Sequence, residues 1–122
     1  MAEAKILVVD DSPTELQLMV EPLLARGYRV ITATNGIEAL EAVARELPQL
    51  ILLDVLMPGK NGFQVCRQLK SDPATRDIKI MFVSSKNQES DRFWGLKQGA
   101  DEYLAKPFTE EALLSHISAL LG

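Results

Sequence analysis

The stretch Lys5–Glu15, "KILVVDDSPTE", joins a short apolar run to two adjacent acids and then to a helix start. Ile6–Val9 is rich in β-branched residues and is typical of a buried strand. Ser12 is followed directly by a proline and, three residues later, by a glutamate, which is the pattern of a helix N-terminus. The stretch therefore predicts a strand–helix unit with Asp10 and Asp11 at the junction.

The same strand–helix pattern repeats along the chain. Strands are predicted at Ile6–Val9, Arg29–Ala33, Leu50–Leu53, Ile78–Val83 and Asp101–Ala105. Helices are predicted from Pro13 to just before Gly27, at Ile37–Glu46, Phe63–Lys70 and Gln88–Gln98, and after the capping residue Thr109. Five alternations of strand and helix are typical of an α/β protein with a parallel sheet covered by helices on both faces.

Two helices carry more detailed predictions. Pro22 lies inside the first helical pattern, where a proline removes a backbone hydrogen bond and crowds the preceding turn. We therefore expect a kink there, with Pro22 on the solvent side. The second helix is predicted to bury Leu40, Val43, Ala44 and Leu47, which share one face.

Length and composition narrow the class of protein. The chain has 122 residues, which predicts one domain, and it is 47% hydrophobic and 25% charged, as ordinary globular proteins are. Its net charge of -4 argues against a nucleic-acid-binding surface. A single cysteine, Cys66, excludes an internal disulfide and fits a reducing compartment. No apolar run is long enough for a secretory leader or a membrane span, so we expect a cytoplasmic protein.

Chemically active residues follow the predicted strands. Asp10 and Asp11 follow the first strand, Asp54 the third, Ser84 the fourth, and Lys106 the fifth. Any one acid after a strand is usually a helix cap or a solvated loop residue. Ligands of open α/β sheets, however, bind at the carboxyl ends of the strands, where all five groups are predicted to converge.

The chemistry of this set points to a metal ion and a phosphoryl group. Two carboxylates about 4 Å apart repel by roughly 4 kcal/mol at an effective dielectric near 20. A Mg²⁺ ion, which prefers oxygen ligands, turns that repulsion into shared attraction. A lysine and a hydroxyl suit a phosphoryl group, and a carboxylate can be the nucleophile that forms an aspartyl phosphate.

Four motifs together carry a family resemblance: "VVDDSP", "LLDVLMPGKNG", "FVSS" and "YLAKPF". With these motifs the chain resembles response-regulator receiver domains over essentially all 122 residues. Within that family it is most similar to stand-alone regulators of the chemotaxis and twitching-motility type. The resemblance implies a flavodoxin-like (βα)5 fold, a doubly wound parallel sheet of strand order 2-1-3-4-5. It also implies a single receiver domain over residues 1–122 with no output domain.

The resemblance further implies roles for the acidic residues. Asp54 would accept a phosphoryl group from a histidine kinase. Asp11 and Asp54 would bind Mg²⁺ directly, together with the backbone carbonyl of Leu56. Asp10 would act through a metal-bound water. The protein would be a phosphorylation-dependent switch of a two-component system, with self-catalysed phosphorylation and dephosphorylation and no other enzymatic activity.

Other implied roles concern the output of the signal. Ser84 would hydrogen-bond the phosphoryl group and Lys106 would pair with it. Tyr103 matches the family's rotating aromatic switch, and the bond between Lys106 and Pro107 matches a cis peptide. Movement of Ser84 and Tyr103 would reshape the surface made by the helix at 88–98, the strand at 101–105 and the last helix. An unknown protein target would bind there, with no nucleic-acid or membrane partner and with the protein monomeric.

Several positions depart from the family's commonest pattern. Ser84 replaces the more frequent threonine, and Ser85 stands where alanine or glycine is usual. Leu56 and Lys86 occupy two variable positions that flank the phosphoryl site. We expect an apolar and a long cationic side chain at these two positions to change the access of the hydrolytic water.

Two other functions remain open from the sequence. A phosphate sink, which drains a kinase without binding a target, would use the same site residues. A phosphatase of the haloacid dehalogenase type also uses Mg²⁺, aspartate, serine and lysine, but it places its nucleophile in a first-strand D-x-D pattern. The adjacent acids Asp10 and Asp11 do not fit that pattern. For Phe93 and Trp94 the sequence leaves two interpretations open: contact with a partner protein, or partial packing in the core.

Overall fold

All five strands pair in parallel in one sheet of order β2-β1-β3-β4-β5, as predicted. The computed structural model describes residues 3–122. Its strands are β1 (Lys5–Val9), β2 (Arg29–Ala33), β3 (Leu50–Leu53), β4 (Lys79–Ser84) and β5 (Glu102–Ala105). Its helices are α1 (Pro13–Ala25), α2 (Gly36–Glu46), α3 (Gly62–Ser71), α4 (Glu89–Lys97) and α5 (Glu110–Leu121). The predicted elements are all present, with boundaries that differ by at most one residue.

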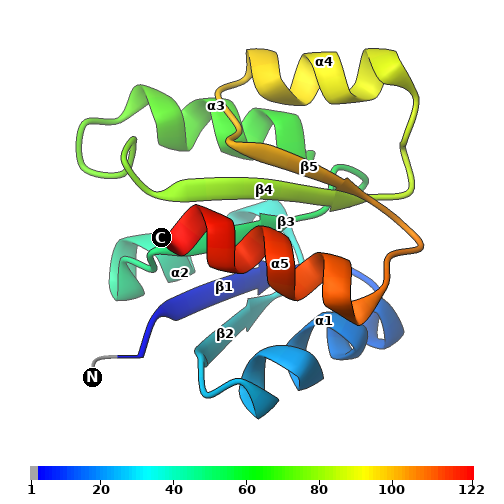
Figure 1. Ribbon diagram of the computed structural model, residues 1–122. Coiled ribbons are helices and arrows are strands. Elements are labelled where there is room, and N and C mark those ends of the chain that lie inside the picture. The colour runs from blue at the N-terminus through cyan, green and yellow to red at the C-terminus, as the bar shows by residue number, and fades with distance from the viewer. Residues whose placement is uncertain (1–2) are drawn as a thin grey trace.

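The sheet separates two hydrophobic cores. Successive residues of a strand point to opposite faces, so β1 sends Leu7 and Val9 into one core and Ile6 and Val8 into the other. The first core is closed by α2 and α3, and the second by α1 and α5 (Figure 1). Burial on both faces explains why Ile6–Val9 of β1 and the whole of β3 are continuous apolar runs.

Polar side chains start the helices that follow the strands. The Ser12 hydroxyl accepts a hydrogen bond from the Glu15 N–H at 3.3 Å, which starts α1 where the sequence predicted. Asn35, Asn61 and Thr109 accept equivalent bonds at the starts of α2, α3 and α5. Each cap satisfies a backbone donor that has no partner within its helix. These caps place the strand-to-helix turns at the carboxyl edge of the sheet.

The prediction that Pro22 lies on the solvent side is wrong. Pro22 is buried, and α1 continues through it to Ala25. Met19 and Leu23 of the same helix are buried as well. Burial of the apolar Pro22 ring offsets part of the cost of the missing backbone hydrogen bond.

The predicted buried face of α2 is partly wrong. Val43 is buried and Leu40 packs partly against the core, but Ala44 and Leu47 are exposed. The helix instead buries small residues, among them Ala39 and Ala42. Small side chains suit a helix that packs close to both the sheet and α3, while Leu47 lies beyond the helix end in a left-handed conformation with φ 44°.

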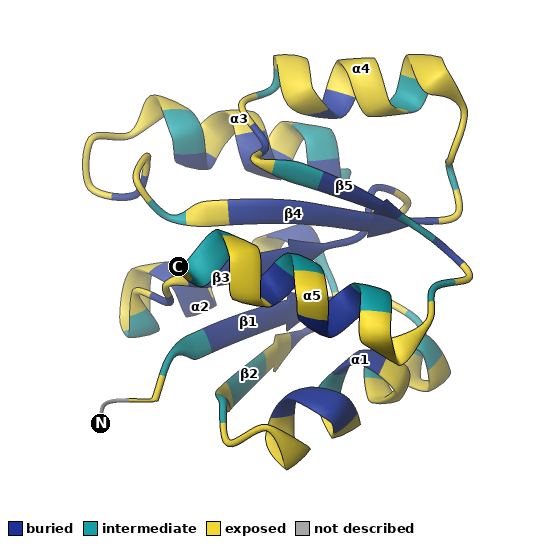
Figure 2. Cartoon of the chain, in the orientation of Figure 1, coloured by how far each residue is buried: buried dark blue, intermediate teal, exposed yellow. Residues whose placement is uncertain are grey.

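Helix α4 lies at the edge of the molecule beside β5 (Figure 1). Gly95 is its only buried residue, and Figure 2 shows the rest of the helix mostly exposed. Phe93 is 56% exposed and Trp94 55% exposed, and their rings form an edge-to-face pair with centroids 6.0 Å apart. Partial core packing, one of the two interpretations left open by the sequence, is therefore wrong, and a partner contact stays a prediction.

Within residues 3–122, none of the helices combines the length and the apolar character that crossing a membrane requires.

Candidate functional site

Three acids meet at the carboxyl edge of the sheet. Because β1 ends at Val9 and β3 at Leu53, the side chains that follow are released from the strand alternation. Carboxylate oxygens of Asp10, Asp11 and Asp54 lie within 4.8 Å of one another. Asp10 and Asp54 are buried, whereas Asp11 is exposed. The sequence predicted this convergence.

Lys106 joins two of the acids. Its ammonium Nζ donates to Asp10 Oδ2 at 2.6 Å and to Asp54 Oδ2 at 3.4 Å. Lys106 is itself 9% exposed and directly follows β5. The other oxygen of Asp10, Oδ1, accepts from the Ser12 N–H at 3.0 Å. Asp10 therefore has a partner for each oxygen, and the lysine offsets part of the repulsion between the two buried carboxylates.

Burial changes the acidity of the reactive groups. Burial raises the pKa of the Asp54 carboxyl, and the positive charge of Lys106 offsets only part of that effect. Burial alone would lower the pKa of Lys106, but the hydrogen bond to Asp10 and the charges of Asp54, Asp10 and Glu15 outweigh it and raise the pKa. Lys106 is therefore firmly charged at neutral pH, and the ionised Asp54 is less stable than an exposed aspartate.

The donor set fits a hard divalent cation. Its candidate ligand atoms are carboxylate oxygens, which Mg²⁺ prefers, and they are close enough to share one ion. When all groups are ionised, three carboxylates and one ammonium leave two uncompensated negative charges, which a divalent ion balances. The exposed Asp11 leaves the cluster open to solvent on one side, so an ion that keeps several waters can be accommodated.

Ser84 and Leu56 both lie near Asp54: Ser84 ends the neighbouring strand β4, and Leu56 lies two residues after Asp54 in the loop that follows β3. Ser84, at the end of β4, is fully buried, and its Oγ accepts from the Lys86 N–H at 3.2 Å. The Leu56 N–H points to Asp54 Oδ1 at 3.4 Å, while the Leu56 side chain is 54% exposed. The backbone of Leu56 is thus close to the acidic cluster, and its side chain is free to influence access from solvent.

Tyr103 connects the site to α4. The ring on β5 is 2% exposed and packs against Phe82 with centroids 5.7 Å apart. Its hydroxyl donates to the backbone carbonyl of Lys86, in the segment between β4 and α4. The Arg92 guanidinium of α4 lies 5.7 Å from the ring centre. Tyr103 is therefore already buried in this structure.

The peptide bond between Lys106 and Pro107 is cis. It lies between β5 and α5, next to the ammonium group that bonds Asp10.

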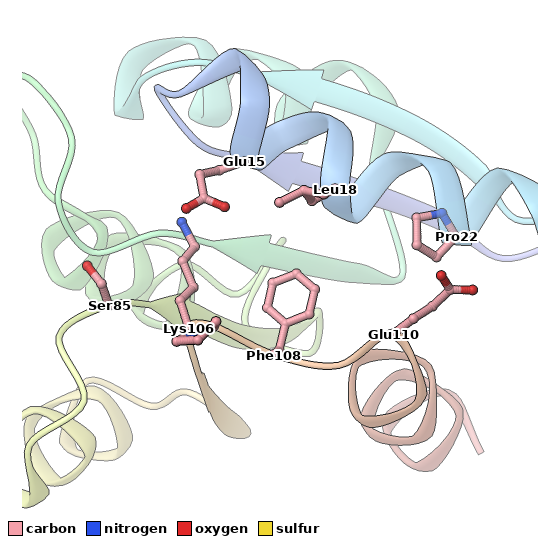
Figure 3. Close-up of a pocket in the computed structure, with 8 residues that line it drawn as sticks. Glu15, Leu18, Pro22, Ser85, Lys106, Phe108 and Glu110 are labelled. Carbon is pink, nitrogen blue, oxygen red and sulfur yellow. The ribbon is translucent and has the colours of Figure 1, made fainter.

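A groove of about 460 Å³ borders the site (Figure 3). Its lining residues come from α1, from the residue that follows β4, and from the segment between β5 and the start of α5: Glu15, Leu18, Pro22, Ser85, Lys106, Pro107, Phe108 and Glu110. Figure 3 shows the Glu15 carboxylate and the Lys106 ammonium turned toward each other. The sequence indicated only a helix-capping role for Glu15, because its spacing from Lys106 along the chain gives no sign of their proximity.

Comparison with known proteins agrees with this geometry. The family model described as the response regulator receiver domain matches residues 6–118. Protein PilH of Pseudomonas aeruginosa is 46% identical over 119 residues, which cover 98% of each chain. The response regulator PleD of Caulobacter vibrioides is 44% identical over 117 residues, but the match spans only 26% of that protein.

Solved structures share the fold. The chemotaxis response regulator CheY4 of Vibrio cholerae superposes with a TM-score of 0.92 at 30% identity, covering 98% of this chain and 99% of that one. The receiver domain of the sensor histidine kinase PA1611 of Pseudomonas aeruginosa superposes with a TM-score of 0.91 at 29% identity, covering 99% of each chain. The latter structure has a magnesium ion coordinated in its active-site cleft. This chain therefore belongs to the response regulator receiver domain family.

Proposed function

We propose that this protein is a phosphorylation-dependent signalling switch in which Asp54 accepts a phosphoryl group from a histidine kinase. The observation that carries the proposal is the position of Asp54, buried beside two further carboxylates and 3.4 Å from the Lys106 ammonium. Asp10, Asp11 and Asp54, with the Leu56 carbonyl, would hold Mg²⁺. Similarity to PilH and CheY4 supports a role in motility or chemotaxis control.

In the proposed reaction, a carboxylate oxygen of Asp54 attacks the phosphorus of a phosphohistidine. The new O–P bond forms as the N–P bond breaks, and the bond's electron pair stays on the departing imidazole. Lys106 pairs with a phosphoryl oxygen and Ser84 donates a hydrogen bond to another. The Mg²⁺ ion, when bound, neutralises negative charge on the transferring group.

The proposed signal runs from Asp54 to the face formed by α4, β5 and α5. A phosphoryl group adds roughly -1.5 to -2 charge next to Ser84 and Lys106. Engagement of Ser84 with this group favours the arrangement in which Tyr103 is buried against α4. The result is a shift between two existing conformations rather than a new fold, and a protein target reads it at the exposed surface of α4.

Labelling with acetyl phosphate and Mg²⁺ tests the assignment of Asp54. Wild-type protein should gain one phosphoryl mass, and Asp54→Asn should gain none because asparagine cannot act as the nucleophile. Asp77→Asn, an exposed aspartate outside the site, is the matched control and should label as wild type does. Equal labelling of Asp54→Asn and wild type would reject the assignment.

Affinity for a target separates the switch from a phosphate sink. The protein is immobilised with and without beryllofluoride and Mg²⁺, a stable phosphoryl mimic, and captured proteins are compared. A switch retains a partner whose affinity rises with the mimic, and Tyr103→Ala should weaken that affinity while labelling persists. A kinase captured equally in both states, with no other partner, would favour the sink.

A further inference from the structure

The loop between β3 and α3 is held against the backbone of Asp54 at Gly62. A Cβ atom on Gly62 would lie 2.2 Å from the Asp54 carbonyl oxygen and 2.9 Å from the Val55 Cα. The Gly62 N–H donates to the Val55 carbonyl at 2.9 Å. No side chain fits between these backbone atoms, so the end of the loop rests directly on the residue that carries the reactive carboxylate.

The same loop is held on its other side by α2. Gly36, the first residue of α2, is buried, and a Cβ there would lie 2.8 Å from the Lys60 carbonyl oxygen. It would also lie 3.0 Å from Val65 Cγ2 and 3.1 Å from Lys60 Cβ. The nearest atom belongs to the backbone and cannot rotate away, so a side chain at Gly36 must displace the loop or the helix.

These two contacts connect the start of α2 to the acidic site. Lys60 lies two residues before Gly62, and Gly62 rests on Asp54. The loop between β3 and α3, which contains Lys60, also carries Leu56, whose N–H points to Asp54 Oδ1. Because folded proteins are closely packed, a displacement of a few tenths of an ångström at Lys60 is passed on rather than absorbed.

We propose that Gly36 is a positioning residue for Asp54, acting through the Lys60 backbone and Gly62. Its missing side chain lets the loop approach α2 closely enough to hold the Asp54 carboxylate and the Leu56 backbone at their observed places. This inference rests on the proposed function, because the quantities that would change are the rate at which Asp54 is phosphorylated and the affinity of the site for Mg²⁺.

The test compares Gly36→Ala with Glu41→Ala, an exposed position on the same helix. Three quantities are measured for each: the rate of labelling by acetyl phosphate, the Mg²⁺ dissociation constant from calorimetry, and the melting temperature. Gly36→Ala should label about tenfold more slowly, because small misplacements of reacting groups have large effects on rate. Its Mg²⁺ affinity should fall as well, while its melting temperature stays near the wild-type value. Glu41→Ala should match wild type in all three.

The outcomes separate this inference from the proposed function. If wild-type protein labels and Gly36→Ala labels equally fast, Gly36 does not position Asp54. A large loss of melting temperature in Gly36→Ala would also overturn the inference, because the clash would then be absorbed by the fold rather than by the loop. If wild-type protein does not label at all, the proposed function fails, and a change in Mg²⁺ affinity alone still tests the positioning by Gly36.

Discussion

At the scale of single residues, Lys106 makes a crowded acidic site compatible with folding. Asp10 is 1% exposed, and its carboxylate would be costly to bury without the ammonium 2.6 Å away. Removing one partner of a buried ion pair typically costs about 3–5 kcal/mol, because the other charge stays buried and unpaired. Lys106 thus stabilises the site before any phosphoryl group arrives, in addition to the role proposed for it afterwards.

Asp54→Asn should raise thermal stability at neutral pH in the absence of divalent cations. Burial raises the pKa of Asp54 in the folded state above its ordinary value of 3.8. The folded state therefore holds this proton more tightly than the unfolded chain, and wild-type stability falls as the pH rises through the raised pKa. Asparagine has no proton to lose, so the variant should melt a few degrees higher than wild type near neutral pH.

The pH dependence of that difference is the decisive measurement. Below pH 3.8 the Asp54 carboxyl is mostly protonated in both the folded and the unfolded state, because its folded-state pKa is raised above that ordinary value, so the melting temperatures should approach each other. Asp77→Asn, at an exposed position, should follow the wild-type curve at every pH. A difference that does not shrink on acidification would mean that ionisation of Asp54 is not the cause.

At the scale of elements, α4 depends on a glycine rather than on an apolar face. Gly95 is the residue that faces the sheet, and a Cβ there would lie 2.9 Å from the Tyr103 ring and 3.1 Å from the Phe82 ring. The large apolar residues of the helix, Phe93 and Trp94 among them, are exposed instead. Helix α4 therefore rests on two aromatic rings with little buried area of its own, which suits an element that reports a conformational change.

Gly95→Ala should destabilise the protein even though alanine favours helix by about 1 kcal/mol over glycine. The added methyl group must push α4 away from Tyr103 and Phe82, and overpacking of this kind typically costs about 1–3 kcal/mol. Urea unfolding measures the net effect, and amide exchange should quicken within Glu89–Lys97. Ser90→Ala, at an exposed position of the same helix, should be neutral or slightly stabilising. Increased stability of Gly95→Ala would contradict the close packing of α4.

At the scale of the whole molecule, the parallel sheet assembles the site. Residues from the ends of β1, β3, β4 and β5 meet at one edge although Asp10 and Lys106 are 96 positions apart in the chain. Two cores, one on each face, hold the strand ends in register. The packing of the two cores offsets the electrostatic repulsion within the acidic cluster. A ligand that neutralises the cluster should therefore stabilise the entire fold.

Mg²⁺ should raise the melting temperature in proportion to the logarithm of its concentration once the site is mostly occupied. A ligand that binds only the folded state stabilises it by about 2.7 kcal/mol at 100 times its dissociation constant. Asp11→Ala, which removes one candidate ligand at an exposed position, should lose most of this gain. Differential scanning calorimetry with potassium salt at matched ionic strength provides the control. The absence of any Mg²⁺ effect on wild-type protein would remove the main support for a metal site.

Local patterns were sufficient to predict the elements and the gathering of the site residues. Continuous apolar runs such as Leu50–Leu53 and caps such as Ser12 depend on near neighbours, so their positions follow from the residues around them. The convergence of Asp10, Asp54 and Lys106 could be predicted because parallel strands place their carboxyl ends together. The buried face of a helix was harder to predict from the sequence. In α2, Ala42 is buried and Leu47 is exposed, because this helix packs closely against its neighbours.

The sequence by itself determined the order of strands and helices, the strand ends that carry reactive groups and, through its motifs, the family. Only the tertiary structure decided how those groups pair: Lys106 with Asp10 and Asp54, Tyr103 with the Lys86 carbonyl, and Gly36 with the Lys60 backbone. The physical reason is the distance along the chain between the residues that interact. Strand and cap signals arise among residues a few positions apart, whereas these contacts join distant segments whose separation is set by the packing of entire helices on the sheet.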